Sequence, residues 1–211
     1  MRLVNIFIGI LRIMTEITWP DEFLPLLMRP RFVPIDVRSI LDVGCGRGII
    51  GALLRIYRDP ERVIGIDSFR PSIDFVRKLG VYDEVIEQDI TKAPIPFDDK
   101  SFDLVLCLEV IEHLEKKEGL KLLDELTRVG KRVIISTPGV YYQQQMYDGN
   151  PYQVHQSQYS VRELEKRGFE VYGVGSLKFA GKTIRYLSPA LGKLTYLLPG
   201  LSSTLLAKKS S

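Results

Sequence analysis

The stretch Ile40-Leu-Asp-Val-Gly-Cys-Gly-Arg-Gly-Ile-Ile50 decides the fold of this chain. An apolar run reaches the acidic residue Asp42 and gives way to glycines at alternate positions, Gly44, Gly46 and Gly48, before a stretch of helical character. This order predicts a buried strand, a tight turn and a helix N-terminus. Glycines at such a turn allow positive φ and close approach to a ligand, toward which the free N–H groups of the helix start point. The stretch therefore predicts a nucleotide-like cofactor.

The composition is typical of one α/β domain. The chain has 211 residues, 45% of them hydrophobic, which is enough for a full core. Its formal net charge of +3 does not indicate DNA binding, because the basic residues are interspersed with 26 acidic ones. The cysteines, Cys45 and Cys107, are too few for a disulfide framework and indicate free thiols in a reducing, cytoplasmic compartment.

Residues 1–37 are expected to form an N-terminal helical cap before a domain at 38–211. The apolar segment Leu3–Met14 looks like a signal sequence, but Arg12 interrupts it and no small-residue cleavage site follows. It is also shorter than the about 20 apolar residues of a membrane span. We expect it to pack on the core or over the active-site mouth, with interfacial membrane contact as the alternative. The proline-containing segment Asp21–Pro34 predicts a short helix and turns.

From Ser39 onward, segments of strand and helix character alternate, which is typical of a doubly wound parallel sheet. Insertions are expected at 137–159 and 178–200. The predicted strands are 39–43, 62–66, 83–87, 102–107, 132–136, 169–175 and 204–208, and the predicted helices are 48–58, 71–79, 112–129 and 161–167.

Acidic residues stand at the ends of consecutive predicted strands. Asp67 closes the second strand, where a carboxylate can accept hydrogen bonds from both hydroxyl groups of a ribose. Asp89 follows the third strand and is placed to meet an adenine amino group, and Asp42 can orient the turn or bind a cationic group. Each aspartate alone could simply cap a turn. Together they favour a cofactor that contains a nucleoside.

Either a dinucleotide or S-adenosylmethionine fits these features, because both use a glycine-rich turn and a ribose-binding acid. The glycines read G-x-G-x-G, whereas the dinucleotide fingerprint is G-x-G-x-x-G, and position 49 is Ile49. The chain resembles the class I S-adenosylmethionine-dependent methyltransferases, especially the group that includes the ubiquinone and menaquinone biosynthesis methyltransferases. The resemblance covers about residues 38–176, and the matching stretches are Leu41–Gly48, Gly65–Asp67, Gln88–Ile90, Ser101–Leu114 and Val133–Gly139.

The resemblance implies a seven-stranded Rossmann-like α/β/α sheet, mostly parallel, with an antiparallel last strand. It also implies S-adenosylmethionine as the cofactor and SN2 methyl transfer to a small-molecule acceptor. The glycines would shape the pocket under the methionine moiety, Asp67 would bind the ribose, and Leu108 would line the sulfonium end. The expected cofactor-binding residues are Asp42, Gly44, Gly46, Gly48, Asp67, Ser68, Asp89, Ile90 and Leu108.

A second cluster of functional residues is expected at Glu109-x-x-Glu112-His113. On a helix this spacing would place the side chains on one face, and His155 follows the fifth strand and could reach the same mouth of the sheet. The expected catalytic residues are His113, as a substrate-side base, with His155 and Glu109, and no metal ligand is assigned. The alternative is a divalent metal site, which would resemble that of the small-RNA 3′-end 2′-O-methyltransferases.

The long segment Thr137–Tyr159 should face the acceptor, and it carries five tyrosines that could stack on a planar acceptor or pack the segment onto the sheet. The acceptor itself and the oligomeric state stay open, RNA is less favoured than a small molecule, and peripheral membrane contact is an option. Two other classes of protein are a nicotinamide-dependent oxidoreductase and a noncatalytic cofactor-binding subunit. The glycine spacing and Asp89 argue against the first, and the full set of predicted ligand residues argues against the second.

Overall fold

The computed structural model describes residues 23–140, 143–146, 149–179, 182–184 and 195–210. Its strands are β1 (Ser39–Val43), β2 (Arg62–Asp67), β3 (Glu84–Glu87), β4 (Leu104–Leu108), β5 (Arg132–Pro138), β6 (Glu170–Phe179), β7 (Lys182–Ile184) and β8 (Ser202–Ser210). Its α-helices are α2 (Phe23–Leu27), α3 (Ile49–Tyr57), α4 (Arg70–Leu79), α5 (Lys116–Val129) and α6 (Val161–Lys166). Short 3-10 turns are η1 (Ile111–His113), η2 (Pro151–Gln153) and η3 (Pro199–Leu201).

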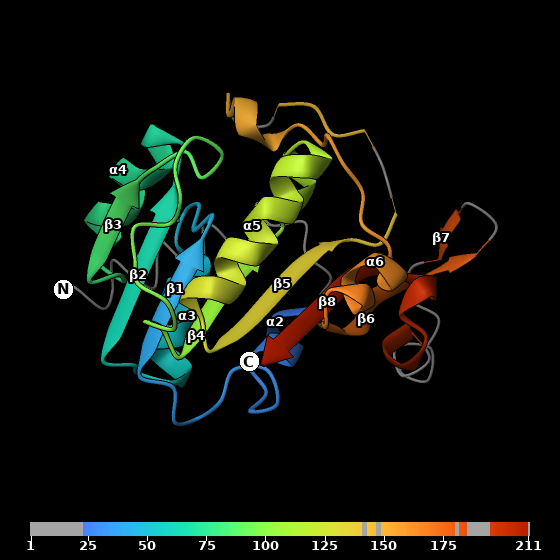
Figure 1. Ribbon diagram of the computed structural model, residues 1–211, viewed down its shortest axis with the longest axis horizontal. Coiled ribbons are helices and arrows are strands. Elements are labelled where there is room, and N and C mark those ends of the chain that lie inside the picture. Colours follow the sequence, from blue (N-terminus) through green and yellow to red (C-terminus); the bar gives the residue numbers. More distant parts are fainter. Residues whose placement is uncertain (1–22, 141–142, 147–148, 180–181, 185–194, 211) are drawn as a thin grey trace.

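The strands form one sheet in the order β3-β2-β1-β4-β5-β8-β6-β7 (Figure 1). The neighbours among β1 to β5 pair in parallel, whereas β8 is antiparallel to both β5 and β6. The predicted, mostly parallel sheet with an antiparallel last strand is confirmed. The short edge strand β7, antiparallel to β6, lies in the predicted insertion at 178–200 and was not expected from the sequence.

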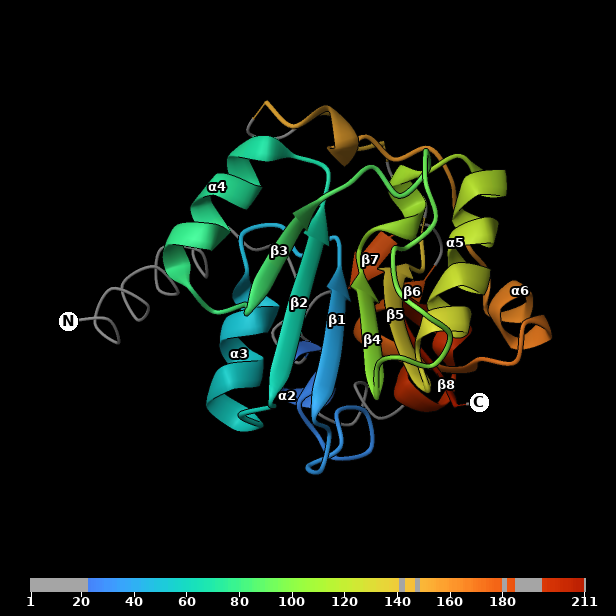
Figure 2. The ribbon, with the colours of Figure 1, turned by 60° about the vertical axis from the view of Figure 1, so that its left-hand side comes forward.

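Helices cover both faces of the sheet and make three layers (Figures 1 and 2). Alternate residues of a strand point to opposite faces, so Ile40 packs with α2, α3 and α4, while Leu41 and Val43 pack with α5 and α6. β4 is buried throughout because its two faces are both covered. The α/β/α architecture expected from the alternating sequence is therefore present.

The ends of the helices follow local sequence signals. Gly80, with φ of 68°, ends α4 in a left-handed conformation that glycine adopts readily. Ser160 begins α6 with a capping box, in which its hydroxyl accepts from the N–H of Glu163 and the Glu163 carboxylate accepts from the N–H of Ser160.

The predicted N-terminal cap falls only partly within the described residues. The segment 1–22 lies outside them, whereas Phe23 and Leu27 of α2 are fully buried against the sheet. Among the described residues, no helix has the length and apolar character needed to cross a membrane.

Candidate functional site: the turn after β1 and the cluster after β4

The turn between β1 and α3 has the backbone conformation that its glycines predict. The φ angles of Gly44, Gly46 and Gly48 are 77°, 49° and 82°, all in the left-handed region. The N–H groups of Gly44 and Cys45 donate to the carbonyl of Ile66 at 2.8 and 3.0 Å. The turn is thus fixed to the end of the neighbouring strand β2.

The three glycines face different surroundings. A Cβ atom on Gly44 would lie 2.3 Å from Cγ2 of Val110, and one on Gly48 would lie 2.4 Å from Cγ2 of Val76. A Cβ on Gly46 would meet no atom within 4 Å. Gly48 therefore allows α3 to pack against α4, Gly44 allows the turn to lie against the segment after β4, and Gly46 borders open space.

Asp67, at the end of β2, holds the turn from the other side. One carboxylate oxygen accepts from the N–H of Gly46 at 2.8 Å, and the other accepts from the N–H of Phe69 at 2.8 Å. Burial raises the pKa of Asp67, although these N–H groups oppose the shift. Each oxygen can accept a further hydrogen bond, so the carboxylate can bind a ligand as well as the turn. Ser68 follows it and is half-buried.

The other predicted cofactor residues lie along the same edge of the sheet. The N–H of Gln88 donates to the carbonyl of Asp67 at 2.8 Å, which places Asp89 and Ile90 next to the end of β2. Asp89 accepts from the N–H and hydroxyl of Thr91 and pairs with Lys92 at 2.8 Å. Burial acts to raise the pKa of Asp89, but these contacts outweigh it, and the pKa is lowered overall. Leu108 ends β4 and is 6% exposed.

Asp42 lies beneath the turn, within the sheet, and is only 2% exposed. Its carboxylate accepts a 2.6 Å hydrogen bond from the hydroxyl of Tyr82. Burial raises the pKa of Asp42 to about 7, against the effect of this hydrogen bond. Tyr82 could not be recognised from the sequence, because a lone tyrosine before a strand belongs to no motif.

The expectation that Glu109, Glu112 and His113 share one helix face is wrong. Glu109 follows β4 with φ of 53°, η1 is a single 3-10 turn, and α5 begins only at Lys116. A residue with positive φ cannot continue a right-handed helix, so the chain turns sharply after the strand. The predicted helix at 112–129 therefore begins four residues later than expected.

The sharp turn after β4 nevertheless brings the expected residues together. The ligand atoms of Glu112, His113 and His155 all lie within 4.8 Å of one another, and the two imidazole rings are 4.9 Å apart between centroids. All three side chains are buried, with exposures of 2%, 9% and 7%. The prediction that both histidines reach the same mouth of the sheet is confirmed. We call these three residues the acid–imidazole cluster.

His113 has a defined orientation within this cluster. Its Nδ1 lies 3.4 Å from the carbonyl oxygen of Val154, and because a carbonyl only accepts, this contact favours the tautomer with the proton on Nδ1. Nε2 then carries the lone pair and lies 4.0 Å from Oε1 of Glu112. Burial, followed by the proximity of His155, lowers the pKa of His113 to about 4. At neutral pH the imidazole is uncharged.

Several buried oxygen atoms around the cluster have no hydrogen-bond partner among the described residues. They are both carboxylate oxygens of Glu112, Oε1 of Glu109 and the hydroxyls of Thr137 and Tyr159. Burial raises the pKa of Glu109 to about 7, and burial together with the charge of Glu109 raises the pKa of Glu112 well above its ordinary value. A buried carboxylate without partners is costly, so burial here favours either the protonated form or a bound cation.

The segment after β5 closes over this region. The N–H groups of Gln156 and Ser157 donate to the carbonyl of Glu112 at 2.8 and 3.0 Å, and the Gln156 side chain donates to the carbonyl of His113 at 2.6 Å. These bonds bring His155 to His113. The segment with η2, orange in Figures 1 and 2, crosses above the carboxyl ends of the central strands.

The tyrosines of this segment divide between core and surface. Tyr159 is 1% exposed and packs under α5, while Tyr152 in η2 is 43% exposed. Tyr141, Tyr142 and Tyr147 lie outside the described residues. Of the two tyrosines that are described, only Tyr152 is free to contact an acceptor.

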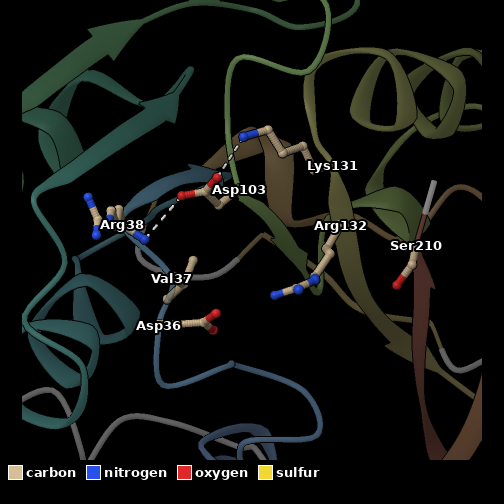
Figure 3. Close-up of a pocket in the computed structure, with 7 residues that line it drawn as sticks. All are labelled: Asp36, Val37, Arg38, Asp103, Lys131, Arg132 and Ser210. Atoms are coloured by element: carbon tan, nitrogen blue, oxygen red, sulfur yellow. Dashed lines mark hydrogen bonds and ion pairs between the residues drawn. The ribbon is translucent and has the colours of Figure 1, made fainter.

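A separate pocket lies at the opposite, amino-terminal edge of the sheet (Figure 3). Asp103 is central there, and it accepts from Lys131 at 2.9 Å and from the N–H groups of Arg38 and Ser39 at 3.1 Å. These contacts tie the starts of β1, β4 and β5 together. Because the glycine turn is at the other end of β1, this pocket is not part of the candidate site.

Comparisons with known proteins agree with the geometry. A family model described as a methyltransferase domain matches residues 41–133. A ubiquinone biosynthesis O-methyltransferase of Rickettsia bellii is 30% identical over 130 residues, which cover 54% of this chain and 53% of that protein. A mitochondrial ubiquinone biosynthesis O-methyltransferase of Dictyostelium discoideum is 26% identical over 122 residues, 51% of this chain and 37% of that protein. The matched part thus spans about a third to a half of the length of these relatives.

The similarity in structure extends over most of the chain. A S-adenosylmethionine-dependent methyltransferase from Archaeoglobus fulgidus superposes with a TM-score of 0.60 at 18% identity, covering 89% of this chain and 92% of that one. The matched family region begins in β1 and ends in β5, and so contains the glycine turn, Asp67, Asp89 and the residues after β4. Residues 41–133 thus match a methyltransferase domain, and the fold of the chain is that of solved S-adenosylmethionine-dependent methyltransferases.

Proposed function

We propose that this protein transfers the methyl group of S-adenosylmethionine to an oxygen atom of a small-molecule acceptor that lies beside the acid–imidazole cluster. The observation that carries the proposal is the contact between the turn and the cluster segment. Gly44 of the turn lies directly against Val110, which is flanked by Glu109 on one side and η1 on the other. A donor bound at the turn and an acceptor bound at Glu112, His113 and His155 would therefore be neighbours.

The residues at the turn fit the cofactor. The open space at Gly46 and the remaining acceptor capacity of Asp67 suit the methionine and ribose parts, with Gly44, Gly48 and Ser68 completing the turn and its partner strand. When bound, S-adenosylmethionine supplies a methyl group that its positive sulfonium already activates. We assign Asp89 and Ile90 to the adenine, Leu108 to the sulfonium end and Asp42 to support of the turn from below.

Glu109 and the acid–imidazole cluster would prepare the acceptor oxygen. An acceptor hydroxyl must lose its proton to attack, and a base works best when its pKa is near the working pH. Glu109, with a pKa raised by burial to about 7, meets this condition better than His113, whose pKa is lowered to about 4. We therefore assign proton removal to Glu109 and contacts with other polar groups of the acceptor to His113 and His155. The protein otherwise acts by alignment and by exclusion of water.

A second candidate is that the cluster binds a divalent metal ion, which would lower the pKa of an acceptor hydroxyl. It is favoured by the two partnerless oxygens of Glu112 next to two imidazoles, of which His113 is neutral, as metal binding requires. Nδ1 of His113 also faces the carbonyl of Val154, an arrangement that orients histidine ligands in metal sites when Nδ1 carries the proton. In this candidate the acceptor can be a small molecule or the ribose 2′-hydroxyl of an RNA.

Transfer of a labelled methyl group from S-adenosylmethionine tests both candidates. Simple catechols and phenols serve as small-molecule probes and a short RNA as the alternative, each with chelator or with added Mg²⁺, Mn²⁺ or Zn²⁺. Transfer that persists in chelator supports Glu109 as the base, and transfer restored only by metal supports the second candidate. Methylation of RNA alone would overturn the small-molecule proposal.

Two controls address the other classes of function. Titration calorimetry with NAD and with S-adenosylhomocysteine should show binding of the second only, since the turn lacks the dinucleotide spacing. Binding without transfer to any probe or to a metabolite extract would indicate a noncatalytic subunit instead. A cytoplasmic location is part of the proposal, because Cys45 and Cys107 are both buried and free.

A further inference from the structure

Tyr82, in the loop between α4 and β3, lies in a slot formed by glycines. A Cβ atom on Gly51 would lie 2.5 Å from Cζ of the Tyr82 ring, and Cβ atoms on Gly48 and Gly65 would each lie 3.3 Å from other ring atoms. Tyr82 is 8% exposed. These glycines belong to the turn, to α3 and to β2, so the missing side chains make room for the tyrosine ring as well as for a ligand.

The Tyr82 hydroxyl connects the two elements that flank the turn. It donates to Asp42 of β1 at 2.6 Å and accepts from the N–H of Gly51, in the first turn of α3, at 3.2 Å. On its other side the turn is bonded to Ile66 and Asp67 of β2. The Gly44–Gly48 turn is thus held at both ends, by β2 on one side and by the Asp42–Tyr82–Gly51 link on the other.

We propose that Tyr82 is a positioning residue for the cofactor: its hydroxyl sets the spacing between β1 and α3 and thereby holds the Gly44–Gly48 turn in the shape that binds S-adenosylmethionine. The inference rests on the proposed cofactor role of this turn. A tyrosine that only filled the slot would do so equally well without its hydroxyl, so a test must separate the hydroxyl from the ring.

The charge state of Asp42 supplies such a test. The groups that face it are Tyr82 from the loop before β3, Cys45 in the turn, Asp67 at the end of β2 and Cys107 on β4. The hydrogen bond from Tyr82 favours the ionised carboxylate, while burial and Asp67 disfavour it. Since the cofactor carries a sulfonium and an ammonium group, an ionised Asp42 below the turn should strengthen its binding as the pH rises.

The experiment measures the affinity of S-adenosylmethionine and S-adenosylhomocysteine from pH 6 to pH 9 for the full chain and for Tyr82→Phe. We expect the substitution to weaken binding by about 10-fold at pH 7.5, as for loss of one buried hydrogen bond to a charged group. The midpoint of the pH dependence should also move to higher pH, because Asp42 loses its donor. Tyr172→Phe is the matched control: it removes another hydrogen-bonded hydroxyl, to Glu170, at the far side of the sheet.

Wild-type affinity and an unchanged pH midpoint in Tyr82→Phe would overturn the inference, as would equal losses in Tyr82→Phe and Tyr172→Phe. Asp42→Asn provides a second variant if Tyr82→Phe does not fold, since the amide still accepts from Tyr82 but does not ionise. It should abolish the pH step, and a retained step would also overturn the inference. Failure of the unmodified chain to bind either ligand would instead refute the proposed function.

Discussion

Nε2 of His113 lies 4.0 Å from Oε1 of Glu112, with no hydrogen bond to that carboxylate oxygen from any described residue. The other ring nitrogen faces the carbonyl of Val154, so the lone pair of Nε2 faces the carboxylate. Two acceptors that face each other repel unless a proton or a cation lies between them. This relationship makes the stability of the acid–imidazole cluster sensitive to pH and to a bound ion.

The stability of the metal-free protein should respond to Glu112→Gln in a pH-dependent way. The folded-state pKa of Glu112 is raised. Its contribution to folding stability is therefore fully present below the unfolded pKa of about 4.3, where the carboxyl group is protonated in both states, and this stability is lost as the pH rises above that value. We expect Glu112→Gln to be more stable than the unmodified protein by about 1 to 3 kcal/mol at pH 8 and by less at pH 5. Urea unfolding after chelator treatment measures this difference, with the exposed Glu115→Gln as the control.

In catalysis, Glu112→Gln should perform worse than the unmodified protein, although we expect it to be more stable at pH 8. Loss of the Glu112 carboxylate should lower methyl transfer by about 100-fold or more, as for loss of a positioned acid–base or metal-binding group. Affinity for S-adenosylhomocysteine should change by no more than about 2-fold, because the glycine turn is untouched. An active Glu112→Gln enzyme would show that methyl transfer does not need the Glu112 carboxylate and would contradict the metal candidate.

The glycines of the turn should separate into a packing glycine and a ligand glycine. Gly48→Ala would clash with Val76 and requires positive φ, so we expect a loss of about 2 to 4 kcal/mol of stability. Gly46→Ala meets open space and should cost about 1 kcal/mol for its φ, yet weaken S-adenosylhomocysteine binding by about 10-fold or more. Urea unfolding and calorimetry on both variants measure this contrast. The contrast would be contradicted if the loss of binding were in the same proportion to the loss of stability in both variants.

Asp67→Ala should lower cofactor affinity by about 100-fold, since both N–H groups that its carboxylate holds would lose their acceptor. The cofactor affinity of Asp67→Asn should lie between those of the unmodified protein and Asp67→Ala, because one acceptor oxygen remains. Asp74→Asn, which removes only an exposed ion pair with Arg70 on α4, serves as the control. Calorimetric titration with S-adenosylhomocysteine distinguishes the three, and an Asp67→Ala variant of full affinity would refute the assigned role.

Acid stability should depend on Asp103, at the far edge of the sheet. The Lys131 ammonium, helped by the N–H groups of Arg38 and Ser39, lowers the pKa of Asp103 to about 2. Its stabilising contribution is therefore present above the unfolded pKa of about 3.9 and is lost as the pH falls toward 2. Asp103→Asn should cost about 1 to 2 kcal/mol at pH 6 and almost nothing at pH 2 in urea unfolding. Asp98→Asn, at an exposed loop position, should show no such difference.

The strands and the glycine turn could be predicted from the sequence because their causes are local. β1 and the turn follow directly from an apolar run and three glycines, and Gly80 ends α4 for the same kind of reason. The boundaries of β4 and α5 were less predictable. Glu109 adopts positive φ after the strand, and a glutamate gives no sequence sign of that.

What the sequence alone determined is the order of strands and helices, the position of the turn and the acids at the strand ends, since these depend on side-chain periodicity and backbone preference. Only the tertiary structure decided which of these residues meet. Three features arise from segments far apart in the chain: the contact of His113 with His155, the Glu112 carboxylate that has no hydrogen-bond partner in the described part of the chain, and the slot of Tyr82. Such contacts depend on how the sheet brings its carboxyl edge together, and neither periodicity nor local preference records that arrangement.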